Sequence, residues 1–133
     1  MCFVASINTK KQYAPYDITV YKICQIKDNC AISLYFDFKY KIGKLNEPIE
    51  LHYTTTEYKD MIIHRGYYSY RNISSKLKCT LFFNYVYIKN VLTSDRAVAK
   101  FIIPKGTAFY ENEQGEIISE NIIYTGVYYA YYG

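Results

Sequence analysis

The chain has 133 residues, half of them hydrophobic, so it is long enough for one folded domain and too apolar to be disordered. Its 18 Tyr and seven Phe residues, without any Trp, favour pleated strands over helices. The net charge of +4 comes from Lys and Arg residues scattered along the chain. The sequence therefore lacks the basic blocks that mark nucleic-acid-binding arms, and nucleic acid is not expected as a partner.

The cysteines and the start of the chain bear on the cellular compartment. The four cysteines, Cys2, Cys24, Cys30 and Cys79, form no C-x-x-C pair, and only two His residues are present, which argues against a structural zinc site. No secretion signal is expected, and no apolar run approaches the length that crosses a bilayer. These features predict free thiols, no cofactor or metal, no membrane partner and a cytoplasmic location. A disulfide between Cys24 and Cys30 is the alternative.

The first third of the chain is predicted to form strands. Residues 2–7 indicate an edge strand, and residues 17–26 are β-branched and aromatic, which is typical of a buried strand. Lys27-Asp28-Asn29 has the composition of a turn. Residues 31–42 then alternate, and we interpret them as a single strand that completes an antiparallel hairpin. One face of that strand would carry Ile32, Leu34, Phe36, Phe38 and Tyr40.

The middle of the chain is where a helix is expected. Residues 54–59 are polar and compatible with one helical turn, which Met61-Ile62-Ile63 would continue. Residues 79–91 are apolar on both faces of a period-two pattern, so they are predicted to form a strand inside the sheet system.

The stretch from Val98 to Ser119 carries the clearest turn signals. An apolar run ends at Pro104, which lacks an N–H group for a strand ladder, and Gly106 can adopt the positive φ that a tight corner needs. Residues 111–115 read as the loop of a following hairpin.

Together these elements predict one mainly β domain over residues 1–133. We expect a compact antiparallel sandwich or split barrel with at most one or two short helices, a β-rich α+β fold being the variant. The aromatic tail at 127–133 would promote aggregation if exposed, so we expect it to be covered by the sheet or by a neighbouring subunit. This predicts a homo-oligomer formed through the tail.

One short segment, residues 64–68, combines several kinds of polar side chain and is a candidate ligand-binding site. Arg65 can grip a phosphate or carboxylate, Tyr67 or Tyr68 can stack a base, and His64 can donate a proton. The structural alternative is that these residues cap a loop and that Gly66 permits a bend into a strand.

A second candidate site is the corner at Lys105 and Gly106, where exposed N–H groups can bind an anion. Its alternative is an ordinary solvated lysine. The acidic residues at 111, 113, 116 and 120 lie in or near a hairpin loop and are interpreted as solvated charge. No nucleophile motif, phosphate-binding glycine loop or framed carboxylate pair is present, so no catalytic residue is predicted.

Two segments resemble parts of the ADP-ribosyltransferase fold. Residues 102–107, Ile-Ile-Pro-Lys-Gly-Thr, are similar to its late strand pair, and residues 18–22 are similar to its early strand. The resemblance implies that Tyr21 and Lys22 face a nicotinamide dinucleotide. The family's catalytic glutamate precedes the Pro-Lys-Gly-Thr corner, where this chain has Lys100, which implies that the transferase chemistry is absent.

More of the chain resembles short uncharacterised proteins of gut-bacterial phages and prophages. The shared segments are the Tyr-Lys pair of an early strand, Lys-Tyr-Lys-Ile-Gly-Lys at 39–44, Gly-Tyr-Tyr-Ser-Tyr at 66–70, and the corner that runs from Ile103 to Ser119. The resemblance implies a phage or mobile-element origin, hence a host-cell cytoplasm, and no particular activity.

We therefore expect a non-enzymatic phage accessory protein that binds a nucleotide-like small molecule or a host protein, in a counter-defence role. A virion or assembly component is the first alternative. An ADP-ribosyltransferase-like enzyme is the second.

Overall fold

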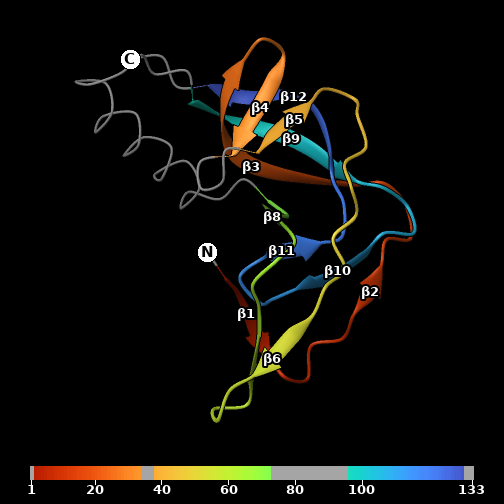
Figure 1. Cartoon of the computed structure of the whole chain (residues 1–133), viewed down its shortest axis with the longest axis vertical. Helices are drawn as coiled ribbons and strands as arrows, with labels where there is room; N and C mark the ends of the chain where they lie inside the picture. The colour runs from red at the N-terminus through yellow and green to blue at the C-terminus, as the bar shows by residue number, and fades with distance from the viewer. Residues whose placement is uncertain (1, 34–37, 73–95, 131–133) are drawn as a thin grey trace, which may run out of the picture.

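The computed structural model describes residues 2–33, 38–72 and 96–130 (Figure 1). Within these ranges the chain forms 12 strands and no helix. The strands make two antiparallel sheets that do not close into a barrel, an arrangement compatible with a β-sandwich. The prediction of a mainly β antiparallel fold is confirmed.

Of the strands in the described ranges, nine form the larger sheet and three form the smaller one. The strands of the larger sheet are β2 (Gln12–Tyr13), β3 (Ile18–Lys27), β4 (Cys30–Ser33), β5 (Lys39–Lys41), β8 (Tyr67–Tyr70), β9 (Arg96–Ile103), β10 (Ala108–Glu111), β11 (Glu116–Ser119) and β12 (Ile123–Ala130). The smaller sheet contains three, which are β1 (Phe3–Ser6), β6 (Tyr53–Thr55) and β7 (Asp60–Ile63). Its order is β1-β7-β6, so β1 is an edge strand, as predicted.

Strand β3 is the centre of the larger sheet. One edge pairs with β9 from Ile18 to Gln25, and β12 lies on the far side of β9. The other edge pairs with β8 at Tyr21 and with β4 beyond it. The sheet continues from β8 through β11 and β10 to β2.

The turn signals between residues 98 and 119 are confirmed. Strand β9 ends at Ile103, directly before Pro104, and Gly106 has a φ of 87° in the corner that leads to β10. Strands β10 and β11 form a hairpin, and Gly115 closes its loop with a φ of 78°.

The predicted single strand at 31–42 is wrong. Strands β4 and β5 pair with each other in antiparallel fashion, so the chain reverses between them. The reversal also shifts which residues share a face: Ala31 lies opposite Tyr40, and both are buried. Ser33 is buried as well, whereas Phe38, expected on the apolar face, is exposed.

The helix predicted at 54–63 is also wrong. This segment is the hairpin of β6 and β7, and Lys59 takes a φ of 62° in its turn. The strand pattern is visible in β7, where Met61 and Ile63 are buried while Ile62 between them is only partly so. Two β-branched threonines at 54–55 favour the pleated form.

The apolar residues form two cores. The first core consists of Ala14, Ile18, Val20, Cys24, Ala31, Tyr40, Tyr67, Ala99, Phe101, Ile103, Phe109, Ile117, Ile122 and Tyr124. The second core consists of Phe3, Ala5, Leu51, Met61, Ile63, Tyr110 and Ile118. In Figure 1, β8 and β11 lie between the β3–β9–β12 part of the large sheet and strands β1 and β6.

Strands β8, β10 and β11 contribute to both cores. In β11, Ile117 enters the first core and Ile118 enters the second, because consecutive strand residues face opposite ways. In β10, Phe109 and Tyr110 divide in the same manner. We call β8, β10 and β11 the shared wall.

Several predictions concern residues outside the described ranges. They include the strand at 79–91, with Cys79, and the last residues of the aromatic tail. The described part of the tail belongs to β12, which pairs with β9. No helix in the described ranges is long and apolar enough to cross a membrane.

Candidate functional site: an acidic groove

An open groove of about 700 Å³ lies between strand β1 and the loop of the β10–β11 hairpin. Its lining comes from four separate parts of the chain. These residues are Val4, Ala5, Ser6, Thr9, Gln12, Asp60, Glu111, Asn112, Glu113, Gln114 and Glu116. Four carboxylates therefore line one groove of a protein whose net charge is +4.

Asn112 holds the two sides of this groove together. Its Oδ1 accepts hydrogen bonds from the backbone N–H groups of Gln114 at 3.1 Å and Glu116 at 3.0 Å, which fixes the hairpin loop. Its Nδ2 donates to the Val4 carbonyl at 3.1 Å and to Glu116 Oε1 at 3.1 Å. One side chain thus sets the loop geometry and its distance from β1.

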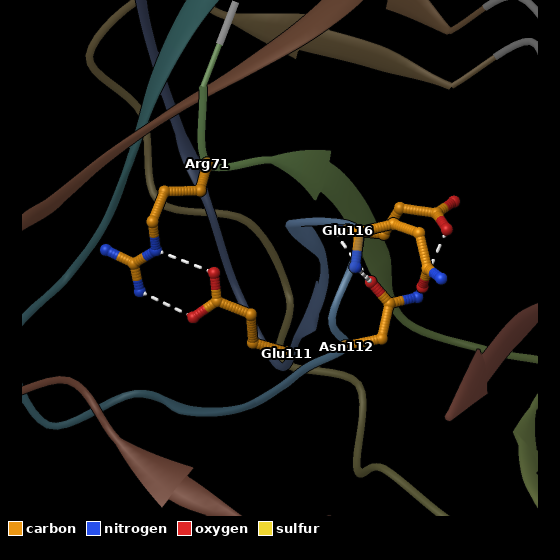
Figure 2. Close-up of polar contacts among 5 residues, drawn as sticks. Arg71, Glu111, Asn112 and Glu116 are labelled. Atoms are coloured by element: carbon orange, nitrogen blue, oxygen red, sulfur yellow. Dashed lines mark hydrogen bonds and ion pairs between the residues drawn. The ribbon is translucent and has the colours of Figure 1, made fainter. Parts of the chain in front are cut away.

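Arg71 neutralises one of the four carboxylates. Its Nε donates to Glu111 Oε2 at 2.8 Å and its Nη2 donates to Glu111 Oε1 at 2.9 Å, a two-pronged contact that Figure 2 shows. The pKa of Arg71 is raised because the hydrogen bond to Glu111 stabilises the charged guanidinium. The formal negative charge left in the groove is that of Asp60, Glu113 and Glu116.

Glu116 is the best-anchored of these three carboxylates. The Tyr68 hydroxyl donates to its Oε2, and Asn112, which Figure 2 shows beside it, donates to its Oε1. Burial raises the pKa of the Glu116 carboxyl, since partial desolvation disfavours its charged form. The Tyr68 ring is itself held edge-on against Phe3, with centroids 6.4 Å apart.

The predicted ligand-binding residues Tyr67 and Tyr68 lie on opposite faces of β8. Tyr67 is only 4% exposed, and its hydroxyl donates to the Glu47 carbonyl at 2.6 Å within the first core. Burial raises the pKa of this hydroxyl. Tyr68 packs against the second core, and its hydroxyl donates to Glu116, a residue that lines the groove. The structure therefore separates two aromatic rings that the sequence placed in one site.

Tyr21 and Lys22 meet β8 rather than an open site. Tyr21 pairs with Tyr70, and its ring lies 5.3 Å from that of Tyr128. Lys22 Nζ donates to the Tyr68 carbonyl at 2.8 Å, and burial lowers the pKa of this ammonium. Both residues thus hold the junction between β3 and its neighbours.

His64 and Arg65 are exposed between β7 and β8. The His64 Nδ1 lies 3.0 Å from the Cys2 Sγ. The next residue, Gly66, has a φ of 156°, and a Cβ added there would lie 2.5 Å from Cγ1 of Ile118. A bend does occur at Gly66, and the side chains packed against it leave no room for a Cβ there.

Lys105 and Gly106 lie in the corner after β9, where their backbone N–H groups contact the segment at 14–17. The Lys105 N–H donates to Asp17 Oδ1 at 2.9 Å, and the Gly106 N–H donates to the Ala14 carbonyl at 2.7 Å. The Asp17 carboxylate lies beside this corner and accepts a hydrogen bond from a backbone N–H. It does not line the acidic groove.

The alternative disulfide between Cys24 and Cys30 is not formed. Both residues are buried free thiols. The register explains this, because Cys24 lies opposite Ser33 and Cys30 lies opposite Lys27. Within the described ranges, no group of three or more His, Cys, Asp or Glu side chains is arranged to hold a metal ion.

Sequence reasoning treated the carboxylates at 111, 113 and 116 as solvated and missed the groove. Their density in one hairpin was the available signal. The partner strand β1, which makes them one side of a groove, lies more than a hundred residues away, and no local pattern connects the two.

Comparisons with protein-family models, curated proteins and solved structures found no match for this chain.

Proposed function

We propose that this chain is a non-enzymatic accessory protein, of phage or mobile-element origin, that binds a host protein through a basic segment. The observation that supports this is the acidic groove, a concave negative site on a protein of positive net charge. Complementary charge speeds encounter and rejects unsuitable partners. A cationic partner would be attracted by the carboxylates that line this groove.

The geometry favours recognition by side chains over strand addition. The Val4 carbonyl on β1 already accepts from Asn112, and the Ser6 carbonyl accepts from the Thr9 N–H at 2.9 Å. Two carbonyl groups along this edge are thus occupied. Lys or Arg side chains of the partner would instead reach Asp60 and Glu113, two acidic residues that line the groove.

A nucleotide-like ligand is less well supported. Its phosphates would be repelled by the carboxylates of the groove. Of the residues expected to bind it, Tyr67 is in the first core, Lys22 is bonded to β8, and Lys105 contacts the 14–17 segment. Thermal unfolding with a panel of nucleotides and nicotinamide dinucleotide tests this alternative, and a ligand-dependent rise in Tm would favour it over a protein partner.

The proposed function is tested with a fluorescent oligolysine peptide, followed by anisotropy at low salt. We expect binding by the wild type, weakened about fivefold in the double variant Asp60→Asn, Glu113→Gln, on the basis of roughly 0.5 kcal/mol for each exposed charge pair. The control is Glu50→Gln, which removes an exposed carboxylate outside the groove. Absence of binding, or equal weakening by the control, would overturn the proposal.

Assembly through the C-terminal tail is the second candidate, and one observation favours it. Among the described strands, β12 ends the order of the large sheet, and Val127 and Tyr128 on it are 48% and 57% exposed. Native mass spectrometry of Tyr128→Ser tests this against Tyr58→Ser, which alters a more exposed tyrosine on another part of the surface. Loss of an oligomer in the first variant alone supports assembly, and a monomeric wild type refutes it.

A further inference from the structure

A thiol and an imidazole lie together at the end of the small sheet. The Cys2 Sγ is 3.0 Å from the His64 Nδ1, and both residues are exposed. At this distance the imidazole nitrogen can accept a hydrogen bond from the thiol, so a base lies beside the sulfur and can take its proton when the sulfur attacks an electrophile. A neighbouring histidine is one of the ways in which proteins activate a cysteine.

The pairing of β1 with β7 holds this contact in place. Phe3 lies opposite Ile63 in the antiparallel register, so the next pair outward is Cys2 with His64. Phe3 and Ile63 are both fully buried in the second core. The two reactive side chains therefore extend from a packed pair of strands, and their proximity follows from the register.

We propose that Cys2 and His64 form a reactive thiol site that undergoes exchange with low-molecular-weight disulfides such as glutathione disulfide. His64 takes the thiol proton as the Cys2 sulfur attacks one sulfur of the disulfide. A new S–S bond forms to Cys2 while the original S–S bond breaks, and the second sulfur leaves as a thiolate that takes up the proton held by His64. The thiol–disulfide exchange is balanced and needs no further oxidant.

The other described cysteines supply an internal contrast. Cys24 and Cys30 are buried, and desolvation raises the pKa of the Cys24 thiol to about 12. A buried, protonated thiol is a poor nucleophile and cannot meet a disulfide in solvent. Cys2 combines exposure with a proton acceptor, so reaction is expected at Cys2 and not at Cys24 or Cys30.

The experiment measures the rate of glutathionylation at pH 7 for each cysteine by peptide-mapping mass spectrometry. A synthetic peptide of residues 1–10 provides the rate of the same thiol without His64. We expect Cys2 in the folded protein to react about tenfold faster than in the peptide, because His64 places a base 3.0 Å from the sulfur that the peptide lacks.

Two variants separate activation from accessibility. In His64→Gln, which keeps a polar side chain but no base, the Cys2 rate should fall to that of the peptide, with an unchanged circular dichroism spectrum and Tm. In Cys2→Ser the adduct should disappear from this position. A Cys2 rate equal to that of the peptide in the wild type, or an undiminished rate in His64→Gln, would overturn the proposal.

Discussion

Asn112 and Val4 lie 108 positions apart in the chain, yet the Asn112 amide donates a hydrogen bond to the Val4 carbonyl at 3.1 Å. This contact crosses the acidic groove and ties the β10–β11 loop to the edge of the small sheet. The same side chain closes the loop through two further bonds. Asn112 therefore controls the shape of the proposed binding site as well as the local turn.

Asn112→Ala should destabilise the fold and loosen the groove. The variant loses four hydrogen bonds, and we expect the free energy of unfolding to fall by about 2 kcal/mol at roughly 0.5 kcal/mol for each bond, as measured by urea denaturation. Gln114→Ala is the control, because the contribution of Gln114 to the turn is its backbone N–H. Equal stability of the two variants would contradict this role for Asn112.

Gly66→Ala should be among the most damaging single-methyl changes in the chain. The added Cβ would lie 2.5 Å from Cγ1 of Ile118 and 2.7 Å from Cδ2 of Leu51, so these two buried side chains would have to shift. We expect a loss of about 3 kcal/mol in the free energy of unfolding, from overpacking together with backbone strain.

The matched control for this change is Gly43→Ala. Gly43 also has a positive φ, of 71°, but nothing lies within 4 Å of its added Cβ. It should therefore lose only the strain, about 1 kcal/mol. If both variants unfold at the same urea concentration, the close approach at Gly66 is not what requires glycine there.

Glu116 should make stability depend on pH in the acidic range. Because burial raises its pKa above the ordinary value of 4.5, the folded protein retains a proton that the unfolded chain has released. The contribution of this group to stability is thus fully present below pH 4.5 and is lost as the pH rises through the folded-state pKa. Between pH 4 and pH 7 the free energy of unfolding of the neutral variant Glu116→Gln should rise relative to that of the wild type, as measured by urea unfolding at each pH. A constant difference would contradict the raised pKa.

Lys22 should produce the opposite trend at alkaline pH. Burial lowers its pKa from 10.5, so between the two values the unfolded chain binds a proton that the folded protein does not. The free energy of unfolding therefore rises with pH across this window. The thiol of Cys24 stays protonated and does not compensate the ammonium at neutral pH.

The variant Lys22→Met tests this. This variant removes the charge and keeps the length of the side chain, so it should be more stable than the wild type at pH 7. The difference in the free energy of unfolding between the two proteins should become smaller toward pH 10. Chemical denaturation at the two pH values measures the change. A wild type that is the more stable protein at pH 7 would show that the bond to the Tyr68 carbonyl outweighs desolvation.

The sequence allowed those parts of the fold to be predicted where local chemistry decides the backbone. Pro104 has no N–H for the ladder, and Gly106 and Gly115 take the positive φ that their turns need, so β9, β10 and β11 were placed correctly. The same logic located the turn at Asp28 and Asn29, whose φ values are 52° and 60°.

The strand predicted at 31–42 was wrong because the alternation of apolar residues continues through a reversal of the chain. Ala31 and Tyr40 have opposite parity along the chain, yet they pair across β4 and β5 and face the same core. A pattern with period two cannot reveal such a reversal. At 54–59 a polar run hid a hairpin, because the burial that identifies β7 comes from contacts with the distant β1.

The candidate site was less predictable than the fold. Its residues come from β1, the segment at 9–12, β7 and the β10–β11 hairpin, and their meeting depends on the pairing of distant strands. The residues chosen from the sequence were attractive because of their chemical types. Tyr67 shows the weakness of that criterion, because a side chain suited to stacking a base instead fills the first core.

The shared wall has a consequence for how the molecule comes apart. Alternate residues of β8, β10 and β11 belong to different cores. Neither core can therefore unfold while the other holds these strands in the sheet. Heat or denaturant should accordingly release both at a single midpoint, reported alike by tyrosine fluorescence and by circular dichroism. A weakening introduced beside the acidic groove would then lower the melting temperature of the whole chain, including parts that never touch it.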